Sequence, residues 1–180
     1  MHGPASDSGG SFKAPVWPCP QRIDVLDTVV VRLGGLRRKL WRRYRDQALE
    51  LWSASGLRFS VTESDYDEAD WDNPDEIARL ESLVVPGKLR LMRMPRLYGG
   101  SIEAIGDWRA GGGVAAFKLG AAFWLDPSYR RRYLLTHEIG HALGLNHNMV
   151  GSGSVMSQPW ATSTKPDAHD LDSLRRYYSL

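Results

Sequence analysis

Residues 137–147 read HEIGHALGLNH, a pattern of three histidines, one glutamate and a glycine near its end at fixed spacings. His137 and His141 are four residues apart, so a helix places both imidazoles on one face, one turn apart. Two neutral imidazoles at this spacing can bind one zinc ion. Glu138 follows the first histidine, where its carboxylate can reach a water on the metal without being a ligand. The pattern therefore predicts a helix that carries His137 and His141.

The end of the motif predicts a third ligand. Gly144 has no Cβ, so it permits a backbone bend that brings His147 back toward the metal. Three protein ligands leave a fourth position open, which is typical of catalytic rather than structural zinc sites. The alternative interpretation is a coincidental HExxH in an exposed helix. The third histidine and the glycine make such a coincidence rare.

Periodicity and alternation give a coarse secondary structure for the rest of the chain. Apolar residues at helical spacing, starting with Leu36 and Leu40, predict a helix with a buried stripe. Asp126 and Pro127 are expected to be the N-cap and first residue of the helix that carries the motif. We expect strands at 22–31, 57–62, 88–94, 114–117 and 121–125, helices at 36–55 and from 166 onward, and irregular chain at 98–113.

At this point the sequence resembles the metzincin clan of zinc proteases, whose signature is HExxHxxGxxH followed by a methionine turn. Met156, in the string SVMS, matches that turn. The C-terminal string from Asp170 to Tyr178 is similar to the last helix of the matrixin branch. The resemblance implies an α+β, zincin-like catalytic domain: a mixed, twisted five-stranded sheet, an active-site helix and a small C-terminal subdomain. It also implies a flexible tail at 1–15 and one domain at 16–180, divided into subdomains 16–144 and 145–180.

The same resemblance implies roles for individual residues. Met156 forms an apolar floor under the metal, and Asp170 anchors the methionine turn. Val114 and Ala115 match the edge strand against which an extended substrate binds. Tyr133 and Trp160 match positions that shape the pocket for the substrate side chain after the scissile bond. The family's second, structural zinc is not expected, because Ala116 stands where relatives have a histidine.

Composition limits the other functions. The formal net charge of +2 and the lack of interleaved aromatic and basic residues argue against nucleic-acid binding. The basic cluster of residues 37–45 is either the solvated face of a helix or a phosphate-binding surface, and the former is favoured. There is no apolar run long enough for a membrane span. Residues 1–13 lack a signal-peptide pattern, whereas matrixin relatives are commonly exported, so the compartment stays open.

Two further features leave alternatives. The single cysteine, Cys19, cannot form an intramolecular disulfide. It is either a small apolar residue or a thiol that blocks the zinc, but the family's signature around such a thiol is absent. The acidic stretch 65–75 carries carboxylates of the kind calcium binds, and matrixins often bind calcium, yet its spacing matches no EF-hand loop.

The sequence thus predicts a monomeric endopeptidase that acts on polypeptides with one zinc ion and with Glu138 as general base. The alternative is a zinc-containing protein-binding module with weak catalysis. The intact glutamate favours the enzyme.

Overall fold

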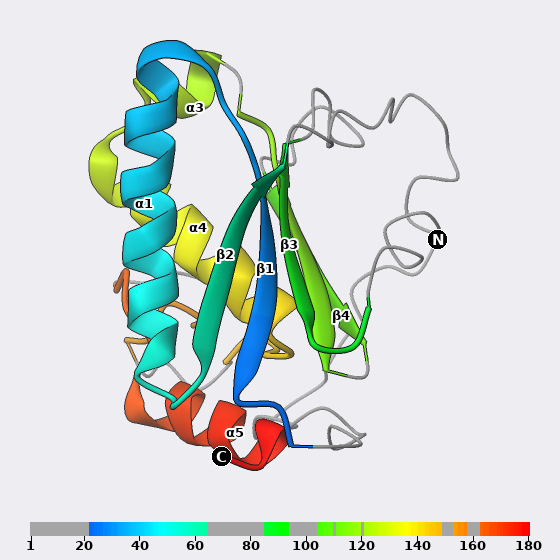
Figure 1. Ribbon diagram of the computed structural model, residues 1–180. Helices are drawn as coiled ribbons and strands as arrows, with labels where there is room; N and C mark the ends of the chain where they lie inside the picture. The colour runs from blue at the N-terminus through cyan, green and yellow to red at the C-terminus, as the bar shows by residue number, and fades with distance from the viewer. Residues whose placement is uncertain are drawn as a thin grey trace, which may run out of the picture.

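The computed structural model describes residues 22–64, 85–93, 104–109, 111–119, 121–148, 153–157 and 163–180. Its centre is a mixed five-stranded sheet in the order β2-β1-β3-β5-β4. Helices α1 (Gly35–Ser53) and α4 (Ser128–Ala142) lie on the same side of this sheet, and α5 (Ala168–Tyr178) lies across one end (Figure 1). None of the helices in these ranges has the length and hydropathy needed to cross a bilayer.

Four strands run parallel and one runs against them. Strand β1 (Val25–Val31) pairs in parallel with both β2 (Arg58–Ser64) and β3 (Lys88–Arg93), and β3 pairs in parallel with β5 (Gly112–Phe117). Strand β4 (Ala104–Arg109) pairs antiparallel with β5 and forms one edge of the sheet. The other edge is β2. Among the described residues, the outer sides of β2 and β4 have no neighbouring strand.

Helix α1 anchors the core between the sheet and α4. Its buried residues include Trp41, Tyr44, Ala48 and Trp52, which recur every three to four positions and so face one side. The indole of Trp41 donates to the carbonyl of Val31 at 3.1 Å. The indole of Trp52 donates to the carbonyl of Thr136 on α4 at 2.9 Å. Two large rings are thus fixed by hydrogen bonds as well as by packing.

The C-terminal end of α4 lies directly against the backbone of β5. A Cβ built on Gly113 would lie 1.7 Å from the carbonyl oxygen of Ala142. Only glycine permits this approach, because any side chain would collide with backbone that cannot move aside. The close contact fixes the position of the end of α4 along β5, and with it the position of the histidine motif relative to the sheet.

The structure corrects several expectations. The predicted strand at 121–125 is the short helix α3 (Ala121–Leu125), since a short apolar run gives no reliable period. The segment expected to be irregular contains β4 and the start of β5. Helix α4 starts at Ser128 with Pro127 in the N-cap position and no side-chain cap, so Asp126 is not the cap. The other four predicted strands coincide with β1, β2, β3 and β5.

The start of α1 also differs from expectation. Leu36 and Leu40 are 92% and 39% exposed, so the buried stripe begins only at Trp41. Both leucines were expected to be part of the core because they continue the helical spacing. In this first part of α1 the two leucine side chains stay exposed, although Arg37 between them lies over the ring of Trp124.

Candidate metal centre

Helix α4 places two of the three histidines. His137 is buried, with 6% of its surface exposed, and His141 is partly buried one turn later on the same face. The two rings meet edge to face, with centroids 4.6 Å apart. The spacing in the motif is therefore realised as a pair of imidazoles aimed at one point.

A glycine turn brings the third histidine to the same point. After α4 the amide of Gly144 donates to the carbonyl of His141 at 2.9 Å, and the amide of Leu145 donates to that of Gly140 at 3.0 Å. This pair of bonds is the Schellman motif, in which the residue after the helix takes a left-handed conformation. Gly144 has φ +106°. The chain reverses there and returns with His147.

The three side chains meet through their Nε2 atoms. The distances are 3.1 Å between His137 and His141, 3.1 Å between His137 and His147, and 3.0 Å between His141 and His147. Ligands of a tetrahedral zinc at about 2.0–2.1 Å lie roughly 3.3–3.4 Å apart, so this triangle has nearly the size that zinc requires. Among the described residues these three form the one group of histidines, cysteines and acids that could hold a metal.

Hydrogen bonds turn the lone pairs of two rings toward the centre. The Nδ1 of His137 lies 2.8 Å from the carbonyl oxygen of Val155, and the Nδ1 of His141 lies 2.7 Å from that of Leu145. A carbonyl only accepts, so each Nδ1 carries the proton and each Nε2 keeps its lone pair. Such partners orient metal-binding histidines in known zinc sites.

The surroundings also keep the rings neutral. Burial lowers the pKa of His137. Burial, followed by the charges of the other two histidines, lowers the pKa of His141 to about 3. Burial, together with the charge of His137, lowers the pKa of His147 to about 4. Neutral imidazoles are the form that binds a metal, so the site is ready for one at neutral pH.

The methionine turn packs against α4 next to the three histidines. Met156 is fully buried, and a Cβ built on Gly140 would lie 2.5 Å from its sulfur. The amide of Asn148 donates to the carbonyl of Met156 at 2.7 Å, which joins the two sides of the turn. The neighbouring Val155 supplies the carbonyl that holds His137. The turn therefore packs against α4 and orients one histidine of that helix, His137.

Asp170 connects this turn to α5. Its carboxylate accepts a short hydrogen bond from the hydroxyl of Ser154, whose oxygen accepts from the amide of Met156 at 2.9 Å. The same carboxylate accepts from the amide of Asp167 at 3.1 Å and completes a capping box at the start of α5. Burial raises the pKa of Asp170. One buried side chain thus links the start of α5 to the methionine turn.

Glu138 and Tyr133 lie on either side of the first histidine along α4. Glu138 is partly buried and directly follows His137. The Tyr133 ring lies one turn earlier, with its centroid 5.2 Å from that of His137. Burial raises the pKa of Tyr133, and the nearby charge of Glu138 raises it further. A carboxylate and a phenol therefore adjoin the histidine cluster.

The expected position of Val114 and Ala115 on an edge strand is wrong. Both are buried in β5, which pairs with β3 on one side and β4 on the other. Their backbone has no free side to offer an extended peptide. Within the described part of the sheet, the edge strand next to α4 is β4, which contacts that helix. Trp160, Cys19 and the acidic stretch 65–75 lie outside the described residues.

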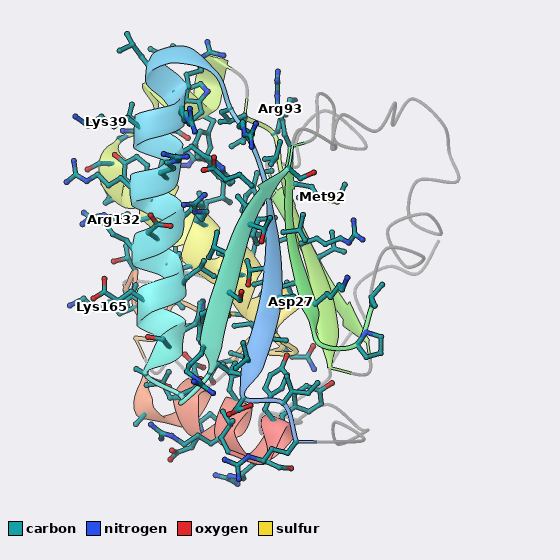
Figure 2. All side chains as sticks on the ribbon, in the orientation of Figure 1. Asp27, Lys39, Met92, Arg93, Arg132 and Lys165 are labelled. Atoms are coloured by element: carbon teal, nitrogen blue, oxygen red, sulfur yellow. The ribbon has the colours of Figure 1, made fainter. Side chains whose placement is uncertain are left out.

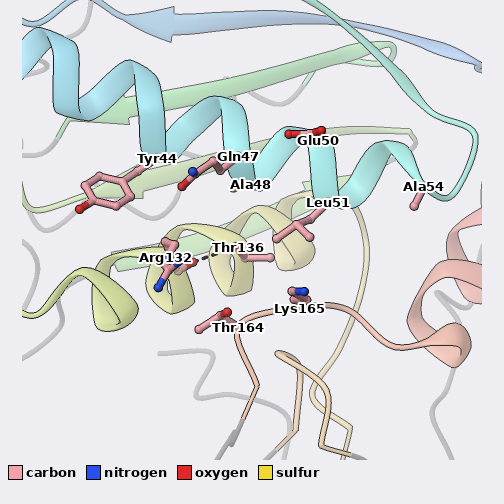
Figure 3. Close-up of a pocket in the computed structure, with 10 residues that line it drawn as sticks. All are labelled: Tyr44, Gln47, Ala48, Glu50, Leu51, Ala54, Arg132, Thr136, Thr164 and Lys165. Carbon is pink, nitrogen blue, oxygen red and sulfur yellow. Dashed lines mark hydrogen bonds between the residues drawn. The ribbon is translucent and has the colours of Figure 1, made fainter.

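A cavity of about 390 Å³ lies on another side of α4, between it and α1 (Figure 3). Its lining includes Thr136 and Arg132 from α4, Gln47 from α1 and Lys165 from the segment before α5. None of the three histidines lines it. The amide of Val155 donates to the carbonyl of Lys165 at 2.9 Å, so the wall of this cavity also supports the methionine turn.

Several residues of the site were not singled out from the sequence. Ser154 and the carbonyl of Val155 belong to the methionine turn, and only their proximity to Met156 was a signal. Gly140 was treated as a variable position of the motif, although it admits Met156 and Trp52. The hydroxyl of Tyr178 donates to the carbonyl of Leu143 at 3.1 Å and holds the end of the zinc helix.

Comparisons with known proteins agree with this geometry. A family model described as Met-zincin matches residues 129–162, which include the three histidines and Met156. The chain is metzincin-like. It carries a histidine triad of the kind that binds zinc, as in a zinc metallopeptidase. No curated protein matches the chain by sequence.

Two solved structures share the fold. Archaemetzincin from Methanopyrus kandleri has a TM-score of 0.55 and 19% identity, over 91% of this chain and 99% of that one. A structure titled "GM1 bound form of the ECX AB5 holotoxin" has a TM-score of 0.55 and 14% identity, over 86% of this chain and 80% of that one. At such low identity the likeness concerns the fold. Neither match singles out the matrixin branch.

Proposed function

We propose that this protein is a zinc-dependent endopeptidase. The observation that carries the proposal is the triangle of Nε2 atoms from His137, His141 and His147, with two of the rings fixed by backbone carbonyls. Three neutral nitrogens within 3.1 Å of one another are mutually repulsive unless they share a cation. The donor set of three imidazoles fits one zinc with an open coordination position.

Each residue then has a defined task. His137, His141 and His147 would hold the zinc, which when bound would supply a more acidic water and a Lewis acid for the scissile carbonyl. Glu138 accepts the proton of the attacking water and later gives it to the leaving amine. Met156 forms the apolar floor of the site. Asp170 holds the methionine turn in place through Ser154, and so keeps the carbonyl of Val155 under His137.

We place the substrate against β4 rather than against β5. An extended polypeptide can add to the free edge of β4 by backbone hydrogen bonds, and this edge adjoins the zinc helix. Tyr133 and Trp160 are proposed to shape the pocket beyond the scissile bond, as in matrixins. We also propose one catalytic domain at 16–180, divided into subdomains 16–144 and 145–180, which acts as a monomer.

Cleavage of a peptide library by the zinc-loaded chain tests this proposal. Glu138→Gln should keep the fold and the zinc but cleave at least about 100-fold more slowly, the scale of a missing general base. Glu50→Gln, which changes an exposed carboxylate on α1, is the matched control and should cleave normally. If the zinc-loaded wild type cleaves nothing in the library, the alternative of a zinc-containing binding module is favoured instead.

A further inference from the structure

Several large apolar side chains stand exposed at one corner of the molecule. Leu36 is 92% exposed and Leu125 is 85% exposed. Tyr129 is 61% exposed and Leu40 is 39% exposed. Isolated exposed leucines are ordinary, but neighbouring ones commonly mark an interaction site. We call these four residues the apolar corner.

Printed contacts join the elements that carry the apolar corner. The guanidinium of Arg37, next to Leu36, lies 5.9 Å from the centre of the Trp124 ring, next to Leu125. Arg131 donates to the carbonyl of Trp124 at 2.8 Å and to the hydroxyl of Tyr44 at 3.0 Å. The first turns of α1, helix α3 and the start of α4 therefore form one surface, at the end where α1 begins (Figure 1).

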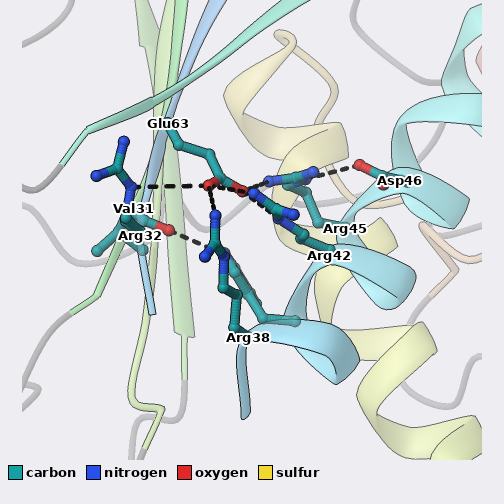
Figure 4. A network of polar contacts seen from close by, with 8 residues as sticks. Val31, Arg32, Arg38, Arg42, Arg45, Asp46 and Glu63 are labelled. Atoms are coloured by element: carbon teal, nitrogen blue, oxygen red, sulfur yellow. Dashed lines mark hydrogen bonds and ion pairs between the residues drawn. The ribbon is translucent and has the colours of Figure 1, made fainter. Parts of the chain in front are cut away.

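Basic side chains surround the apolar corner. Arg37, Lys39 and Arg43 are exposed on α1, and Lys39 points away from the body of the protein (Figure 2). Arg38 and Arg42 share a single carboxylate, that of Glu63, with ion-pair distances of 3.4 and 2.6 Å (Figure 4). The net charge of the whole chain is only +2, so this surface concentrates positive charge locally.

The described acids that pair with arginines of this surface do not cancel its charge. Glu63 is shared by four arginines, namely Arg32, Arg38, Arg42 and Arg45. Asp46 pairs with Arg45 at 2.7 Å. Asp126 pairs with Arg130 at 3.6 Å. Each of these acids is already matched by at least one arginine, so the remaining cations stay available to an anionic partner.

We propose that the apolar corner and its basic rim dock onto an anionic lipid surface. Leu36 and Leu125 are almost fully exposed and neither lines the cavity between α1 and α4, which suits insertion between lipid headgroups better than recognition by a folded protein. The basic rim matches the negative surface of an anionic leaflet, where each lysine or arginine strengthens binding. Trp124, half-buried beside Leu125, is of the type found at membrane interfaces. This inference is independent of the proposed peptidase activity.

Vesicle flotation with the full chain tests the proposal. We expect binding to phosphatidylcholine vesicles that contain about 30% phosphatidylglycerol, and no binding to pure phosphatidylcholine. Raising the salt from about 0.1 M to about 0.5 M should weaken binding. The double variant Leu36→Glu, Leu125→Glu should bind at least about tenfold more weakly, because two apolar side chains no longer insert. Lys39→Glu with Arg43→Glu should lose about fivefold or more for each cation.

Two controls keep the interpretation strict. Val61→Glu changes an exposed apolar residue on β2, and Arg176→Glu changes an exposed cation on α5; both should bind vesicles as the wild type does. Circular dichroism and thermal unfolding of all variants should match the wild type. Equal binding to neutral and anionic vesicles, or unchanged binding by the leucine variant, would overturn the proposal. The proposal would also be overturned if the protein bound no vesicles and instead self-associated, with the self-association abolished by Leu125→Glu.

Discussion

Replacing Gly144 by valine should weaken zinc binding, because it strains the backbone turn that brings His147 to the other two histidines. Gly144 has φ +106°, a conformation that a β-branched residue adopts only under strain. Such strain costs roughly 1–3 kcal/mol. The metal-free chain relieves it by letting the turn open, but the zinc-bound chain needs the turn closed to keep His147. Since about 1.4 kcal/mol is a tenfold change, zinc affinity should fall roughly 5- to 150-fold.

Zinc titration against a competing chelator measures the affinity, and urea unfolding without zinc measures the stability. Gly56→Val is the matched control. Gly56 follows α1 with φ +100°, and a Cβ there would make only ordinary contacts with Leu180. Gly56→Val should lower the free energy of unfolding by roughly the same 1–3 kcal/mol of backbone strain. It should leave the zinc affinity unchanged. If Gly144→Val binds zinc as tightly as Gly56→Val does, the turn does not position His147 and the reasoning fails.

Three further changes test the supporting structure. Asp170→Ala should lower the free energy of unfolding by about 1–3 kcal/mol and weaken zinc binding, because Ser154 loses its buried acceptor; an unchanged zinc affinity would separate the turn from the metal. Gly140→Ala should destabilise the protein by about 1–3 kcal/mol despite the better helix propensity of alanine, because its Cβ would lie 2.8 Å from the Trp52 ring; a stability gain in urea unfolding would show that the core gives way. The arginines around Glu63, above all Arg42, hold its pKa at about 2, so the stabilisation by this carboxylate is complete above about pH 4.5 and is lost as the pH falls toward 2. Glu63→Gln should therefore cost about 1–3 kcal/mol at neutral pH and only a small part of this at pH 2, where the Glu63 carboxyl is about half protonated; a pH-independent difference would contradict this.

The features that the sequence predicted well are those set by local spacing. His137 and His141 share a helix face because they are four residues apart, and Gly144 ends the helix in the conformation that glycine favours. Helix α1 and four of the strands follow from periodicity within single segments. These patterns need no knowledge of the rest of the chain.

The features that the sequence missed depend on contacts between distant segments. Nothing local shows that β4 (Ala104–Arg109) pairs outside β5, so Val114 and Ala115 were expected at an edge that they do not occupy. The same holds for Leu36, whose helical spacing matches the core although no described element covers it. Residues 121–125 are too few to distinguish a strand from a helix by period.

The link between Asp170 and the methionine turn was predicted only in part. The family pattern of the C-terminal helix led to Asp170 as an anchor, and its carboxylate does bind Ser154. No pattern in the chain indicated that Ser154 would be the partner, or that the carbonyl of Val155 would hold His137. Backbone groups carry no side-chain signature, so such contacts require coordinates.

The most direct test of the central claim is the metal itself. We predict about one zinc per chain, with an X-ray absorption spectrum that shows three imidazole nitrogens at about 2.0–2.1 Å and a fourth light ligand. His141→Ala should lose most of this zinc. A spectrum with a sulfur ligand, two tightly held zinc ions per chain, or unchanged zinc content in His141→Ala would contradict a single site built from His137, His141 and His147.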